Sequence, residues 1–277
     1  MPKPTAAMLC LALLLGASPP ASDAPEPAPT GTIKGQIAID ADGALVAPRL
    51  DEAVVYLDAH PALDPPGPVE ELEAPPIEQR PHVIQHERAF HPRLLVVANG
   101  TWVEFPNWDA FAHNVFSRSP AAPPFDMARY PHGRSKAYQF VRVGVVQVFC
   151  NIHPNMRATV VVTPNEHFAR VDDAGRFTLE AVPLGDYELV VWHPRAAEAR
   201  AGVTVAADDV AKLDLSLVHD AEENPRPGRQ RQRRGDDVTR GLAVPRQHLH
   251  LPEVRESHRA WPGSAPEGHH HHHEAAH

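Results

Sequence analysis

The stretch VFCNIHPNMRATVVV, residues 148–162, places a thiol, an imidazole and a thioether at Cys150, His153 and Met156. Each of these residues is separated from the next by two others, so one tight turn can aim all three side chains the same way. Thiolate and neutral imidazole bind either copper or zinc, whereas a thioether is a good copper ligand and a poor zinc ligand. These residue types therefore indicate a copper site in the loop.

Such a site needs a second histidine, because two histidines, one cysteine and a weak axial methionine form the electron-transfer site of blue copper proteins. We expect this ligand to be His113, which follows a strand-like run and a short loop in VEFPNWDAFAHNVFS. Four other upstream histidines are expected at the surface: His82, His86, His91 and His132. A binuclear copper centre would need a second cysteine in the loop. A catalytic zinc site is disfavoured by Met156 and by the lack of an evident general base.

The N-terminus indicates where this chemistry takes place. Residues 1–23 begin with one cation at Lys3, continue with a short apolar run and end in small residues and prolines, which is typical of a secretory signal. The apolar run is too short for a membrane-spanning helix, which needs about 20 residues. Cleavage would remove Cys10 and leave Cys150 as a lone thiol, which in an oxidising compartment must be buried or metal-bound. We therefore expect a periplasmic or secreted protein that does not span a membrane.

The rest of the pattern predicts an all-β chain. Short valine-rich runs alternate with Gly, Pro and Asn, and no convincing amphipathic helix is present, which favours one or two antiparallel sandwiches. Asn99-Gly100 lies between two such runs and predicts a tight hairpin. In residues 144–150 alternate side chains share one face, so Val146, Val148 and Cys150 should point the same way.

HNVFS followed by FCNIHPNM resembles the cupredoxin family, and the C-x-x-H-x-x-M loop is similar to the loops of its amicyanin and pseudoazurin members. The resemblance covers about residues 84–163. It implies a Greek-key sandwich or barrel that binds one type 1 copper through His113, Cys150, His153 and Met156. It also implies that Asn114, beside the first ligand, braces the loop that carries the cysteine. Phe111, Phe149 and Ile152 could form an apolar shell around the metal.

A second resemblance lies in residues 172–218, where G-x-F-x-L and V-P-x-G-x-Y are similar to a carboxypeptidase regulatory-like, or transthyretin-like, β-sandwich. It implies a small Ig-like module with a structural or adhesive role. His193 in this segment is a possible ligand, although a surface position is favoured. The segment is short for an independent domain, so the N-terminal strands pair either with it or with the copper domain.

We therefore expect the chain to divide into six parts. These are a signal peptide (1–23), N-terminal strands (31–60), an acidic proline-rich insertion (61–81), a copper domain (82–164), the regulatory-like segment (165–218) and a disordered Arg/His-rich tail (219–277). The tail ends in a run that binds Cu(II), Ni(II) or Zn(II) loosely: His269, His270, His271, His272, His273 and His277. The formal net charge of −9, and carboxylates mixed with the arginines of the tail, argue against binding to nucleic acid.

Two functions remain open. The first is an exported electron carrier that exchanges single electrons with a dehydrogenase, reductase or oxidase through one type 1 copper. The second is a copper-binding or storage protein without redox turnover, aided by the histidine tail. A catalyst is not expected, because no Ser-His-Asp spacing, paired carboxylates or phosphate-binding glycine loop stands out. A monomer is expected.

Overall fold

The structure is a computed structural model that describes residues 28–40, 49–63, 73–207, 210–219 and 255–257. The expected signal peptide and the histidines of the tail, His269–His273 and His277, lie outside the described residues. The described residues form β-strands and short 3-10 turns at Leu50–Glu52 (η1) and Ile77–Gln79 (η3), which confirms the all-β prediction. No helix among them is long and apolar enough to cross a membrane.

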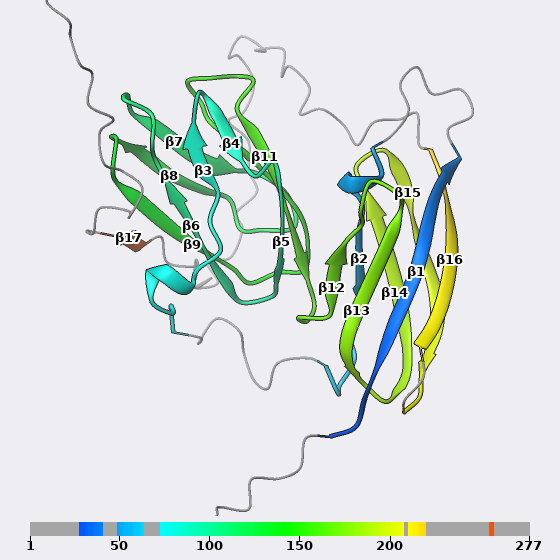
Figure 1. Cartoon of the computed structure of the whole chain (residues 1–277). Helices are drawn as coiled ribbons and strands as arrows, with labels where there is room; N and C mark the ends of the chain where they lie inside the picture. The colour runs from blue at the N-terminus through cyan, green and yellow to red at the C-terminus, as the bar shows by residue number, and fades with distance from the viewer. Residues whose placement is uncertain (1–27, 41–48, 64–72, 208–209, 220–254, 258–277) are drawn as a thin grey trace, which may run out of the picture.

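The strands form two β-sandwiches that lie side by side (Figure 1). The first contains β1 (Thr30–Asp40), β2 (Val54–Leu57), β12 (Phe168–Arg170), β13 (Arg176–Pro183), β14 (Gly185–His193), β15 (Ala196–Val205) and β16 (Val210–Val218). The second contains β3 (Ile84–His86), β4 (Ala89–His91), β5 (Leu94–Ala98), β6 (Thr101–Pro106), β7 (His113–Ser117), β8 (Phe125–Tyr130), β9 (Ser135–Phe140), β10 (Gly144–Phe149), β11 (Arg157–Thr163) and β17 (Arg255–Ser257). The chain leaves the first sandwich after β2 and re-enters it at β12, so we call the two the host sandwich and the inserted sandwich.

The host sandwich settles where the N-terminal strands belong. Its sheets have the orders β13-β1-β16 and β12-β2-β14-β15. β1 pairs antiparallel with β13 and parallel with β16, and β2 pairs antiparallel with β12 and β14. Alternate residues of these strands, such as Ile33, Leu57 and Leu189, are fully buried between the sheets. The regulatory-like segment is short because two of its strands precede the insertion.

The inserted sandwich places the candidate ligands. Its sheets have the orders β5-β11-β10-β7-β8 and β17-β9-β6, with the small β3-β4 hairpin at one end. β10 and β11 form an antiparallel pair, and the loop between them carries the cysteine motif. Val146 and Val148 are fully buried and Cys150 is 4% exposed, which confirms that they share the core-facing side of β10.

The prediction of a hairpin at Asn99-Gly100 is wrong. β5 pairs with β11 in one sheet, whereas β6 pairs with β9 in the other, so the turn crosses between the two sheets. Its amides bond to both sheets: Asn99 N donates to Thr163 O at 2.8 Å and Gly100 N donates to Phe140 O at 2.7 Å. Gly100 has φ 88°, a conformation that glycine adopts without strain. The turn residues were recognised correctly, but the strand pairing depends on partners far away in the sequence.

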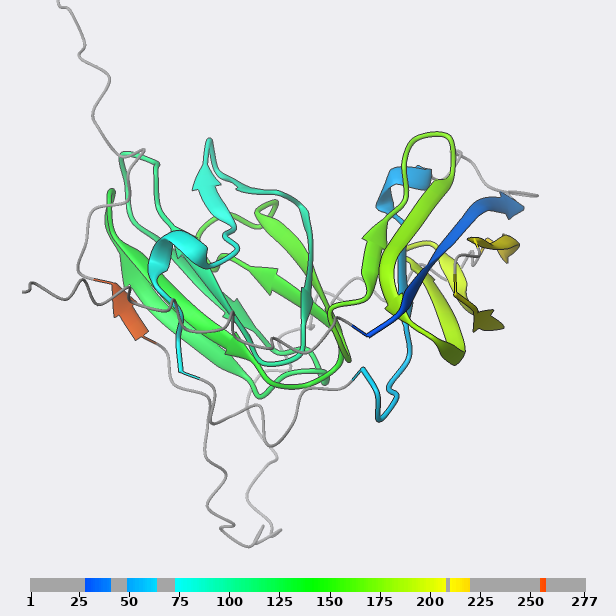
Figure 2. The same ribbon diagram turned by 60° about the horizontal axis from the view of Figure 1, so that its bottom comes forward.

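An apolar layer joins the two sandwiches. It consists of Val54, Tyr56, Val96, Val161, Val190 and Trp192, and we call it the interlayer. Strand alternation produces it: on β11, Val160 and Val162 face the core of the inserted sandwich, whereas Val161 faces the host. Figure 2 shows the same side-by-side arrangement after rotation. Both faces of the β5-β11-β10 part of the sheet are therefore packed.

Two segments outside the expected copper domain contact the inserted sandwich. In the described part of the proline-rich insertion, Arg80 pairs with the buried Glu104 at 2.9 Å and donates to Pro75 O at 2.8 Å. Within the tail that was expected to be disordered, β17 pairs antiparallel with β9. This strand covers three residues of the tail, Arg255–Ser257.

Candidate metal centre

Three donor atoms converge at one end of the inserted sandwich. Nδ1 of His113 lies 3.2 Å from Nδ1 of His153 and 3.7 Å from Sγ of Cys150, and the remaining pair, His153 Nδ1 and Cys150 Sγ, is 4.0 Å apart. His113 opens β7, Cys150 directly follows β10, and His153 lies in the loop before β11. In the part of the chain that the structure describes, no other group of His, Cys, Asp or Glu meets the geometry for an ion.

These distances fit a bound metal. With metal–nitrogen bonds of about 2.0–2.1 Å and a metal–sulfur bond of about 2.3 Å, tetrahedral or trigonal donors lie about 3.3–3.8 Å apart. The observed separations of 3.2, 3.7 and 4.0 Å bracket this range. The two imidazoles and the thiol can therefore close on one ion with small movements.

Met156 adds a thioether at the end of the loop. It is fully buried in the core cluster that also contains Cys150. Met156 N donates to His153 O at 2.9 Å and Cys150 N donates to Met156 O at 3.2 Å, which folds the loop into a compact turn. The His113, Cys150, His153 and Met156 cluster is consistent with a type 1 copper site.

Asn114 ties the ligand loop to β7. Its Oδ1 accepts a hydrogen bond from Asn151 N at 2.9 Å and lies 3.6 Å from Cys150 Sγ. Its Nδ2 donates to Asp126 Oδ1 on β8 at 3.1 Å. The residue next to the first ligand thus bridges β8 and the loop that carries the cysteine.

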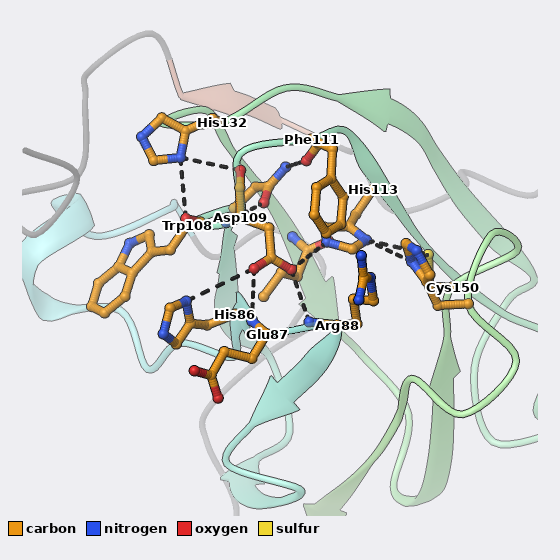
Figure 3. Close-up of polar contacts among 12 residues, drawn as sticks. His86, Glu87, Arg88, Trp108, Asp109, Phe111, His113, His132 and Cys150 are labelled. Atoms are coloured by element: carbon orange, nitrogen blue, oxygen red, sulfur yellow. Dashed lines mark hydrogen bonds and ion pairs between the residues drawn. The ribbon is translucent and has the colours of Figure 1, made fainter. Parts of the chain in front are cut away.

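Asp109 is a residue that the sequence analysis missed. Its carboxylate is nearly buried, and its Oδ2 accepts a hydrogen bond from His113 Nε2 at 2.6 Å (Figure 3). Desolvation raises the pKa of Asp109, but hydrogen bonds from Arg88 N, His113 and Glu87 N together lower it below its usual value. An ionised carboxylate can only accept at this contact, so the hydrogen bond favours the His113 tautomer that carries its proton on Nε2, with Nδ1 facing the other donors. The D-x-x-x-H spacing in WDAFAH was the available signal.

The expected apolar shell is only partly present. The ring of Phe111 packs against His113 and His153, with centroids 5.1 and 5.6 Å apart, and Ile152 packs against the core. Phe149 was assigned to this shell wrongly. It neighbours Cys150 on a strand with alternating faces, so its ring points away from the core and packs against Phe116.

The other histidines do not join the cluster. His132 Nδ1 lies within hydrogen-bond distance of the backbone carbonyls of Trp108 and Asp109, at 3.2 and 3.1 Å. His82, His86 and His91 are not among the residues that converge on the candidate centre. His193 is neither a ligand nor a surface residue: it is 2% exposed, its Nε2 bonds Arg49 O at 3.1 Å, and its Nδ1 accepts from Arg195 N at 3.0 Å.

The topology and the donors together identify the inserted unit. Two facing sheets hold a cysteine and two histidines at one end, with a methionine buried in the same core cluster as the cysteine, in the order that the sequence resemblance implied. The inserted sandwich has a cupredoxin fold. From here we call it the cupredoxin domain.

Comparison with protein families supports the regulatory-like resemblance of the host sandwich. Residues 151–218 match the carboxypeptidase regulatory-like domain family. The match begins inside the ligand loop, whereas β11 pairs with β10 and β5 of the cupredoxin domain, so the host sandwich itself resumes at β12. No curated protein gives a significant match to the chain.

Several solved structures are similar to part of the chain. A copper-containing nitrite reductase from Thermus scotoductus SA-01 is 28% identical, with 30% of this chain and 22% of that chain covered and a TM-score of 0.29. A reduced Cu(I) form of amicyanin is 20% identical, with 39% and 97% covered and a TM-score of 0.29. A purple cupredoxin from Nitrosopumilus maritimus is 22% identical, with 30% and 99% covered and a TM-score of 0.27. The match thus spans less than a quarter of the nitrite reductase.

Proposed function

We propose that this protein is a type 1 copper protein that transfers single electrons between redox partner proteins. The observation that carries the proposal is the convergence of His113 Nδ1, His153 Nδ1 and Cys150 Sγ beside the buried Met156. Bound copper would supply reversible one-electron chemistry at this site. One electron is accepted from a reduced partner and one is given to an oxidised partner, so no atoms are transferred.

The side chains of the protein supply a site whose geometry changes little. Asp109 fixes one imidazole, and Asn114 ties the ligand loop to β7. Rigid ligands limit the rearrangement that accompanies electron transfer. His153 is only partly buried and contacts Phe111, which is 38% exposed, so this edge is the proposed place where a partner docks. Redox encounters of this kind use small, transient interfaces.

We propose a carrier rather than a catalyst because of the donor set. Catalytic metal sites keep an open coordination position for water or substrate, whereas closed sites fill their positions with protein side chains. Here two imidazoles, a thiol and a thioether are available, and the methionine is fully buried. Copper held by all four would have no evident position for a substrate.

The site of action is also a proposal. The signal-like residues 1–23 and the single remaining cysteine support export to the periplasm or beyond, where a dehydrogenase, reductase or oxidase would be the partner. Partial burial, and then the neighbouring His113 and Arg88, lower the pKa of His153. A lower pKa favours the neutral imidazole, which is the form that binds a metal.

The test is the visible spectrum of the copper-loaded mature chain. We expect an intense thiolate-to-copper band, one tightly bound copper and reversible electrochemistry. Cys150→Ala should abolish the band, whereas Met156→Leu should keep the band and change the reduction potential. Several weakly bound coppers, no band, and loss of most binding after deletion of residues 268–277 would instead indicate copper storage.

A further inference from the structure

We propose that Asp109 is a positioning residue that holds His113 in its metal-binding orientation and connects it to the tip of the β3-β4 hairpin. The proposal rests on the proposed function, since it names what orients one ligand of the same site. Its basis is a set of contacts that converge on one nearly buried carboxylate (Figure 3).

Both oxygens of Asp109 are occupied. Oδ2 accepts from His113 Nε2 at 2.6 Å and from Arg88 N at 2.9 Å. Oδ1 accepts from Glu87 N at 2.7 Å, and His86 Nδ1 lies 3.9 Å away from it. Because the partners come from the hairpin on one side and from β7 on the other, the carboxylate joins two segments that the sequence separates.

The segment that carries Asp109 is itself fixed. Asp109 N donates to Asn107 Oδ1 at 3.0 Å. The Nδ2 of the same Asn107 donates to Phe111 O at 2.9 Å and to Tyr130 O at 3.0 Å. The backbone that carries Asp109 is therefore held in place by bonds to the loop and to β8.

The tip of the β3-β4 hairpin has an unfavourable backbone conformation that hydrogen bonds to Asp109 stabilise. Glu87 and Arg88 have φ values of 51° and 57°, in the left-handed region that residues other than glycine seldom adopt. In this conformation their consecutive N–H groups both point at Asp109. Strained backbone of this kind persists where the surroundings over-determine it, and the two bonds to the carboxylate do so here.

The contact with His113 has a chemical consequence. A carboxylate that accepts the remote N–H of a metal-binding imidazole fixes its tautomer and makes the coordinating nitrogen more basic. A more basic ligand stabilises the more highly charged state of a metal, so it lowers the reduction potential. A residue that only capped the hairpin would have neither effect on His113.

The first test uses the metal-free protein. In the wild type, nitrogen NMR should show His113 as a single tautomer protonated on Nε2, with slow amide exchange at Glu87 and Arg88. Asp109→Asn should mix the two tautomers and speed exchange at both amides. The matched control is Asp172→Asn, because the exposed Asp172 also accepts two backbone N–H groups, from Ala174 and Arg176, but lies in the host sandwich.

The second test uses the copper-loaded protein. Asp109→Asn should weaken copper binding about 10- to 100-fold and raise the reduction potential, whereas Asp172→Asn should change neither. Asp109→Glu keeps the charge, so its copper affinity and reduction potential should lie between those of Asp109→Asn and the wild type. If Asp109→Asn does not fold, Asp109→Glu is the variant to measure.

The outcomes separate the two proposals. An unchanged His113 tautomer in Asp109→Asn, or unchanged affinity and potential, would overturn the role of Asp109. A wild-type protein without a thiolate-to-copper band would overturn the proposed function, while the metal-free measurements would still decide whether Asp109 orients His113.

Discussion

The two sandwiches bury their polar side chains very differently. In the cupredoxin domain, among the described residues, the buried polar side chains are Gln85, Glu104, Asn107, Asp109, His113, Asn114, Ser117, Ser135, Gln139 and Thr163. Among the described residues of the host sandwich, His193 is the one member of this class, and Asn165 lies in the connection to β12. The host core is therefore almost purely apolar, whereas the cupredoxin domain carries a polar network through its interior.

This difference predicts which substitutions should change the stability of the protein and which should change the candidate metal site. Buried polar groups cost free energy unless they are satisfied, and a network rigidifies a site only where its members are paired. Several buried polar atoms of the described cupredoxin domain lack a hydrogen-bond partner, including Gln85 Oε1, Glu104 Oε1 and Trp108 Nε1. The host core and the interlayer consist of buried apolar side chains, whose burial stabilises the fold. Substitutions in the host should thus change stability, and substitutions near the ligands should change the site.

The largest effect should come from the interlayer. Trp192→Ala removes a nearly buried indole between the sandwiches and should lower the free energy of unfolding by about 3–5 kcal/mol. Because the interlayer couples the two units, circular dichroism and the visible band should report one shared, lower midpoint in denaturant. An unchanged midpoint for the visible band, with an earlier transition of the host alone, would show that the sandwiches unfold separately.

A somewhat smaller effect is expected in the host core. Leu189→Ala leaves a cavity at a fully buried position and should lower the free energy of unfolding by about 2–5 kcal/mol. The visible spectrum of the folded, copper-loaded protein should not change, because β14 contributes no ligand. Leu184→Ala, at a position that is 37% exposed, is the control and should stay within about 0.5 kcal/mol of the wild type. A spectral change in Leu189→Ala would contradict the prediction that substitutions in the host change stability without changing the candidate metal site.

Near the candidate ligands, a substitution should change the visible spectrum more clearly than it changes stability. Asn114→Ala leaves the Asn151 N–H without its acceptor and should cost about 1–3 kcal/mol. It should also alter the visible band, because the loop that carries Cys150 loses its tie to β7. Asn151→Ala is the matched control: its side chain is exposed and its backbone N–H remains. Equal spectra for the two variants would show that Asn114 does not brace the loop.

The candidate metal ligands were accessible to sequence analysis because their chemistry is local. Cys150, His153 and Met156 lie within one loop, and the alternation of β10 fixes which way the cysteine points. Asp109 was not recognised, because a single carboxylate gains its meaning only when β7 and the β3-β4 hairpin bring His113 and two amides to it.

Strand pairing was less accessible for the same reason. The Asn99-Gly100 turn has hairpin residues, yet its strands belong to different sheets. β15 contains Ala, Glu and Arg, which favour helices, but it pairs with β14 along nearly its whole length because the sheet overrides local propensity. The insertion of one sandwich into another likewise depends on long-range pairing of β2 with β12 and β14.

The smallest effect concerns His193, a polar side chain buried in the described part of the host sandwich. Desolvation lowers the pKa of His193, and its Nδ1 accepts a hydrogen bond from Arg195 N that protonation would break. Because the folded pKa lies below the unfolded value of about 6.5, the stabilisation is complete above that pH. It is lost as the pH falls from there through the folded pKa, since the unfolded chain then binds a proton that the folded protein does not.

In the metal-free protein, the difference in unfolding free energy between wild type and His193→Gln should therefore shrink between about pH 8 and about pH 5. Desolvation also lowers the pKa of His167, so its contribution to stability should be lost in the same direction of pH. A variant that lacks both histidines should therefore show the weakest dependence of unfolding free energy on pH. A difference that stays constant across this range would mean that His193 is protonated equally in both states. In that case the host sandwich would tolerate a buried charge, and its apolar core would not be what distinguishes it from the cupredoxin domain.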